Sequence, residues 1–149
     1  MRAMVVCGAR EALADDWYDA VDATIGWDDA VLIHGACGVD ADTQDWTKLK
    51  GIDAIARTIA EYRDFELLEM PAAWGRLGKA AGPVRNGKML DVLMALGECG
   101  YEIAVLAFHD NVDHSSRGTK NMVARARMAG VPFAVYDRNG RAYQEGNAP

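Results

Sequence analysis

The sequence has no long hydrophobic run. No stretch reaches the roughly 20 consecutive apolar residues that a membrane helix needs, and the first residues enter a short apolar segment without the profile of a signal peptide. We therefore expect no membrane-spanning segment and a cytoplasmic protein.

Cysteine and histidine are scarce, with three residues of each type. Cys7, Cys37 and Cys99 are odd in number and widely spaced, which predicts reduced thiols and argues against a disulfide framework or a zinc site. The remaining candidate ligands, His34, His109 and His114, fit no compact metal-binding motif, although each could still act as an acid or a base. The sequence thus predicts no metal site and no required cofactor. A divalent metal could still accompany a nucleotide ligand.

Basic residues are fewer than acidic ones, with 16 Lys and Arg against 22 Asp and Glu. The formal net charge is -6 and the isoelectric point is near 5.0, so the chain has no global positive field to hold a nucleic-acid backbone. The densest basic set is Arg117, Lys120, Arg125 and Arg127, and helical spacing spreads these residues around a helix. A DNA-binding role is therefore the third choice among the functions considered below.

Two common phosphate-binding fingerprints are missing. No GxxxxGK[ST] segment occurs, which argues against a P-loop nucleotide hydrolase, and no GxGxxG follows the first apolar run, which argues against an ordinary dinucleotide dehydrogenase. A nucleotide site in this chain would need a different arrangement of loops.

What is present is a regular alternation of short apolar runs and helical patterns in 149 residues, about one domain. The runs predict five strands, at Met1–Cys7, Ala30–Ile33, Phe65–Met70, Ile103–Phe108 and Val131–Tyr136. The intervening spacings predict helices at Asp16–Ile25, from Gly51 to about residue 63, at Asn86–Gly97 and from Gly118 to about Ala129. We expect a three-layer Rossmann-like α/β fold over residues 1–137, with a mostly parallel five-stranded sheet and helices on both faces. Residues 38–50 form an insertion, and residues 138–149 form a polar tail.

In such folds the ligand binds beyond the carboxyl ends of the strands. This rule selects four loops, at residues 8–10, 34–38, 74–86 and 109–119, and the third contains a glycine-rich basic segment from Arg76 to Arg85. Loops there lead into helix amino ends, whose free N–H groups attract anions, and glycine lets a backbone approach a phosphate closely. The glycines predicted at this edge are Gly8, Gly35, Gly38, Gly82 and Gly118.

Arginines and aromatics occur in the same loops. Arg10, Arg85 and Arg117 are suited to bidentate phosphate contacts. Thr119 is expected either to contact a phosphate oxygen or to cap the last major helix. Trp46 and Trp74 offer flat surfaces for a base or for packing.

The segment Ala80–Leu90 carries an AGPxRN element that follows an Ala-x-Trp element at Ala72–Trp74. Together with Val6–Arg10, Ile33–Ala36, Gly51–Ala56 and Arg117–Met122, it resembles the YspA/YpsA-related family of the SLOG superfamily, which is common in phages. The resemblance covers about residues 3–136. It implies a nucleotide-binding Rossmann-like fold, a homo-oligomer and, for a phage protein, the host cytoplasm. The site residues that it implies are Gly8, Arg10, Gly35, Asp53, Arg85, Asn86, Gly118 and Thr119.

The chain departs from the family pattern at two places. The insertion makes Asp40 an alternative to Asp53 for the acidic position, and we prefer Asp53 because the helical stripe begins beside it. The PGGxGTxxE loop of the related Lonely Guy hydrolases, with its catalytic glutamate, is not matched by the segment from His109 to Val123. Their activity is therefore not carried over.

Two functions follow from these residues. The first is binding of a nucleotide or nucleotide-derived phosphate ligand, as a sensor or sequestering module. The alternative is a hydrolase of N-glycosidic or phosphate bonds, with Asp53 positioning water and Arg85 stabilising developing charge.

Overall fold

The structure is a computed structural model that describes residues 1–36, 49–115 and 117–148. Within this part of the chain, six strands form one sheet. The strands are β1 (Arg2–Gly8), β2 (Ala30–His34), β3 (Glu66–Glu69), β4 (Glu102–Phe108), β5 (Phe133–Tyr136) and β6 (Ala142–Gly146). The helices are α1 (Ala14–Ile25), α2 (Ile52–Tyr62), α3 (Trp74–Leu77), the 3-10 turn η2 (Gly78–Ala80), α4 (Ala81–Glu98), α5 (Val112–Ser115) and α6 (Arg117–Ala129).

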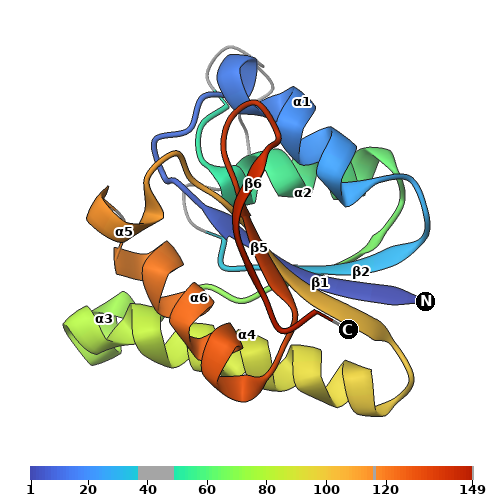
Figure 1. The fold of residues 1–149 in the computed structure, drawn as a ribbon. Helices are drawn as coiled ribbons and strands as arrows, with labels where there is room; N and C mark the ends of the chain where they lie inside the picture. The colour runs from blue at the N-terminus through green and yellow to red at the C-terminus, as the bar shows by residue number, and fades with distance from the viewer. Residues whose placement is uncertain (37–48, 116, 149) are drawn as a thin grey trace.

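The sheet has the strand order β3-β2-β1-β4-β5-β6, and only β6 runs antiparallel to its neighbour. Helices α1 and α2 cover one face of the sheet, and α4 and α6 cover the other (Figure 1). Each face has its own apolar core, because the central strands β1 and β4 bury side chains on both sides. The three-layer Rossmann-like fold predicted from the sequence is thereby confirmed.

The chain leaves β1 and β4 toward opposite edges of the sheet, because β1 leads to β2 and β4 leads to β5. The two strands are hydrogen-bonded neighbours along their whole length, from the Arg2–Glu102 pair to the Gly8–Phe108 pair. A reversal of strand order of this kind opens a crevice at the carboxyl ends of the two strands. The topology therefore fixes where a ligand site belongs.

The predicted number of strands was wrong by one, because the segment predicted as a polar tail contains β6. Asp137 accepts backbone hydrogen bonds on its side-chain oxygen from Asn139 and Arg141, and so stabilises the turn between β5 and β6. β6 lies at the sheet edge and is half exposed, so its side chains show little of the hydrophobic alternation that marks a strand.

The segment from Arg76 to Arg85 was predicted as a glycine-rich loop, and the structure shows it as helical over most of its length. Helix α4 begins at Ala81, five residues before the expected start at Asn86. Pro83 is compatible with this start, because a proline in the first turn of a helix removes an N–H that has no helical partner. The glycine at position 82 favoured the prediction of a loop, but it lies in the first turn of α4. Its contact with a neighbouring side chain is described below.

None of the helices in the described ranges has the length and apolarity needed to cross a bilayer.

Candidate functional site

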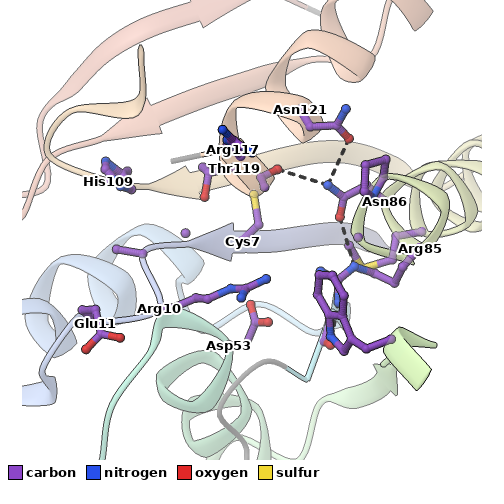
Figure 2. A pocket seen from close by; sticks show the side chains of 18 of the residues that line it. Cys7, Arg10, Glu11, Asp53, Arg85, Asn86, His109, Arg117, Thr119 and Asn121 are labelled. Atoms are coloured by element: carbon purple, nitrogen blue, oxygen red, sulfur yellow. Dashed lines mark hydrogen bonds between the residues drawn. The ribbon is translucent and has the colours of Figure 1, made fainter. Parts of the chain in front are cut away.

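A cleft of about 850 Å³ opens at the carboxyl ends of β1, β2 and β4, at the position expected from the strand order (Figure 2). Its walls come from the loops after these strands and from the amino ends of α2, α4 and α6. A volume of this size lies within the roughly 300–1,000 Å³ range of small-molecule sites. The lining residues are Cys7, Gly8, Ala9, Arg10, Glu11, Gly35, Asp53, Trp74, Lys79, Gly82, Pro83, Arg85, Asn86, Met89, His109, Arg117, Gly118, Thr119 and Asn121.

All the residues predicted for the site from the sequence line this one cleft. They are Gly8, Arg10, Gly35, Asp53, Arg85, Asn86, Arg117, Gly118 and Thr119. Their placement in one cleft is a fact of the structure, while the ligand contacts and catalytic roles assigned to them stay predictions. The alternative acid, Asp40, lies outside the described residues.

Among the glycines predicted at this edge, Gly8, Gly35 and Gly118 differ in what requires a glycine, Gly82 is described below, and Gly38 lies outside the described residues. A Cβ at Gly8 would stand 2.2 Å from the carbonyl oxygen of Phe108, and one at Gly35 would stand 2.1 Å from Nη1 of Arg85. These two residues are therefore required by packing within the protein. A Cβ at Gly118 would meet no atom within 4 Å, so this glycine leaves open space at the beginning of α6.

Arg85 ties the loop after β2 to α4. Its guanidinium, on a side chain that is 9% exposed, donates from Nη1 to the carbonyl oxygen of Gly35 at 2.7 Å. Its Nε donates to Oδ1 of Asn86 at 3.0 Å. Hydrogen bonds from a charged donor are among the stronger ones in proteins. Arg85 therefore holds the cleft wall in place whether or not it also touches a ligand.

Asn86 continues this network into α6. Its Nδ2 donates to the carbonyl oxygen of Gly118 at 3.1 Å and to Oδ1 of Asn121 at 3.2 Å, as the dashed lines in Figure 2 show. Oδ1 of Asn121 also accepts a bond from Nε of Arg125 at 3.0 Å. The amino ends of α4 and α6 are thus locked to each other by side-chain hydrogen bonds, which preorganises the cleft between them.

Thr119 is buried and is the third residue of α6, so it does not precede the helix as an N-cap residue does. The sequence left capping and phosphate contact open for this residue. Thr119 is therefore not the N-cap residue of α6. Its side chain lines the cleft, and the phosphate contact stays a prediction.

The cleft is richer in cations than the protein as a whole. Arg10, Lys79, Arg85 and Arg117 all line it, against the two acids Glu11 and Asp53. Among the described residues, Arg10, Lys79 and Arg117 form no ion pair. Unpaired cations in a concave surface create a local positive potential, even though the net charge of the chain is -6.

Asp53 and Cys7 both line the cleft. Asp53 is 8% exposed and lies in the first turn of α2, where a carboxylate complements the helix dipole. Burial, and secondarily the negative charge of Asp53, raises the pKa of the Cys7 thiol to about 12. Cys7 is therefore a neutral thiol at physiological pH and a poor nucleophile.

His34 is fully buried at the end of β2. Its Nδ1 accepts a hydrogen bond from the backbone N–H of Ala36 at 2.9 Å, which in the neutral ring places the proton on Nε2. Nε2 lies 3.5 Å from Oε1 of Glu69. Burial lowers the pKa of His34 below its ordinary value, against the opposing charges of Asp53 and Glu69. A structural role for His34 fits this geometry.

Several lining residues were not assigned to the site from the sequence. The sequence gives Trp74 only as part of the Ala-x-Trp element and as a flat surface for a base or for packing, and it gives Asn121 only as part of a resembling segment. Lys79 carried no motif and comes to the cleft because η2 leads into α4. In the part of the chain that the structure describes, no group of three or more His, Cys, Asp or Glu side chains could hold a metal ion.

The fold and the cleft define a Rossmann-like α/β protein with a cation-lined pocket at the carboxyl edge of its sheet. Comparisons with protein-family models, with curated proteins and with solved structures find no match to this chain. The resemblance to the SLOG superfamily therefore stays a prediction.

Proposed function

We propose that the chain binds a nucleotide or nucleotide-derived phosphate ligand in the cleft, as a sensor or sequestering module. The observation that carries the proposal is the amino end of α6. Gly118 there leaves open space within the cleft, and Arg10 and Arg117 line the same cleft without an ion-pair partner in the described chain. A helix amino end flanked by arginines suits a phosphate, since free N–H groups, the helix dipole and guanidinium donors all favour an anion.

The size and lining of the cleft favour a ligand larger than inorganic phosphate. Trp74, Pro83 and Met89 add apolar surface to the cleft that the cations also line. A site that combines apolar and cationic surface suits an amphipathic phosphate ester better than a free ion.

The first experiment is a thermal-shift screen against mono- and dinucleotides, cyclic nucleotides, NAD and ADP-ribose, because a ligand that binds the folded state raises Tm by mass action. A hit is then titrated by calorimetry against Arg117→Ala, with Arg141→Ala as the control. Arg141 is exposed in the turn between β5 and β6 and does not line the cleft. We expect Arg117→Ala to weaken binding by roughly 1.5–3 kcal/mol, the range for a hydrogen bond to a charged group. No shift across the panel would refute the proposal.

A hydrolase acting at the same site is the second candidate, and the buried carboxylate of Asp53 favours it. If Asp53 positions a water molecule, Asp53→Asn abolishes turnover of the bound ligand and spares its binding. Arg85, the other residue predicted to be catalytic, bonds to Gly35 and Asn86, and its loss is expected to disturb the cleft wall first.

A DNA-binding role gains no support from α6. Arg125 bonds to Asn121, and the guanidinium of Arg127 lies 5.0 Å from the ring centroid of Phe133. Both cations are thus engaged with the protein itself. The homo-oligomer that the resemblance implies stays a prediction, which gel filtration with light scattering tests.

A further inference from the structure

Trp74 is a large aromatic residue that is 46% exposed on the wall of the cleft. It belongs to neither of the two apolar cores. About half of the indole ring is therefore apolar surface in contact with water that does not contribute to the protein's core.

The ring is supported on one side by the backbone of α4. A Cβ at Gly82 would stand 3.2 Å from Cη2 of Trp74, tighter than an ordinary contact. Glycine at this position lets the indole lie close to the first turn of α4, and a side chain there would push it away. The ring is thus held in place although it is half exposed.

Arg10 approaches the same ring from the loop after β1. Its guanidinium carbon lies 5.4 Å from the centroid of Trp74, within the distance of a cation–π contact. The ring therefore has a face that accepts a flat, delocalised group inside the cleft. A nucleobase is such a group, and bases stack on tryptophan in many nucleic-acid-binding proteins.

A comparison with Trp27 shows why the contact at Trp74 can be exchanged for a ligand. The guanidinium of Arg63 lies 4.2 Å from the centroid of Trp27, and Arg63 is fixed by Asp22 and by the carbonyl oxygen of Gly26. Arg10 has no ion-pair partner in the described chain. Its guanidinium is free to leave the ring when another flat group arrives, and the cation is then available to a phosphate.

We propose that Trp74 is the base-binding surface of the cleft, so that its ligands are nucleoside phosphates whose base stacks on the indole. This inference rests on the proposed function, because it presumes that the phosphate is bound at the amino end of α6. Recognition by stacking discriminates weakly between bases. Purines, with two fused rings, cover more of the indole than pyrimidines and bind more tightly.

The test compares adenosine 5'-monophosphate with ribose 5-phosphate, which has the same phosphate and sugar but no base. Calorimetric titrations are made with the wild-type chain and with Trp74→Leu, Trp74→Phe and Trp27→Leu. The last is the matched control, since Trp27 is an exposed tryptophan, 69% accessible, in the segment that precedes β2 at the opposite end of that strand from the cleft.

In the wild-type chain we expect adenosine 5'-monophosphate to bind about tenfold or more tightly than ribose 5-phosphate, as one stacked base allows. Trp74→Leu removes this difference and leaves ribose 5-phosphate binding unchanged, which also shows that the variant is folded. Trp74→Phe keeps part of the difference, and Trp27→Leu keeps all of it.

Equal affinities of the two compounds for the wild-type chain overturn the inference and leave the proposed function standing. The same holds if the advantage of adenosine 5'-monophosphate survives Trp74→Leu. If neither compound binds and the nucleotide panel gives no thermal shift, the proposed function fails and the inference fails with it.

Discussion

The contact between Gly35 and Arg85 makes a sharp prediction about stability. An added Cβ at Gly35 would lie 2.1 Å from Nη1 and 2.5 Å from Cζ of Arg85. The ordinary distance between carbon atoms in contact is about 3.5 Å, so in Gly35→Ala the guanidinium must withdraw by roughly 1 Å or more. The backbone of Gly35 is not in the left-handed region, and the substitution therefore acts through this clash alone.

The magnitude follows from the hydrogen bonds that the guanidinium loses. Its bond to the carbonyl oxygen of Gly35, at 2.7 Å, is broken, and its bond to Asn86, at 3.0 Å, is strained. A hydrogen bond from a charged donor contributes about 1.5–3 kcal/mol, and water in the cleft rehydrates part of the displaced group. We expect a loss of about 2–3 kcal/mol in the free energy of unfolding, or roughly 5–10 °C in Tm for a chain of this length.

Urea denaturation of a double-mutant cycle checks this explanation. In the Arg85→Ala background the obstacle is gone, so Gly35→Ala is expected to cost almost nothing. Gly8→Ala is a useful upper reference, because the obstacle there is the backbone oxygen of Phe108, which cannot swing aside. If Gly35→Ala costs as much in the Arg85→Ala background as in the wild type, the clash is not the cause and the reasoning is refuted.

Three other predictions concern Gly118, His34 and the cysteines. In Gly118→Ala the added Cβ has open space, and alanine is a better helix former than glycine in α6. We therefore expect the free energy of unfolding to rise or stay equal, and the affinity for the phosphate ligand to fall. A titration with unchanged affinity would remove Gly118 from the site. Burial lowers the pKa of His34, so as the pH falls the unfolded chain takes up a proton near pH 6.5, before the folded chain does. Below that pH the free energy of unfolding therefore falls, by up to about 1.4 kcal/mol per pH unit. Urea titrations at pH 7.5 and 5.5 should show a smaller drop in the free energy of unfolding for His34→Asn than for the wild type, and an equal drop in the two proteins would refute this explanation. Iodoacetamide at pH 8 should alkylate the exposed Cys99 in the folded protein and leave Cys7 unmodified until urea is added, because the pKa of Cys7 is raised to about 12. Rapid labelling of the half-buried Cys7 in the native state would contradict its neutral character.

Much of the fold could be predicted because the central strands are buried on both faces. Continuous apolar runs such as Ala30–Ile33 stand out in the sequence and locate the strand whatever the rest of the chain does. The edge strand β6 has no such signal. Its pairing partner, β5, is what makes Ala142–Gly146 a strand.

The candidate site could be predicted as a set of residues but not as an arrangement. Loops after parallel strands must meet at one edge of the sheet, so the sequence alone predicts that Arg10, Asn86 and Thr119 lie together. Nothing in the local sequence indicates that Asn86 bonds to Asn121 across two helices, because that contact depends on how α4 packs against α6.

Gly35 illustrates how the sequence and the tertiary structure divide the explanation. The sequence by itself determined that a glycine follows a buried strand at the ligand edge, because the apolar run ends there. Only the tertiary structure decided why it is glycine. The guanidinium of Arg85, from a helix fifty residues further along the chain, occupies the space where a Cβ would stand. Hydrophobic periodicity is local and can be read from neighbouring residues, whereas this exclusion of volume exists only once distant segments are packed together.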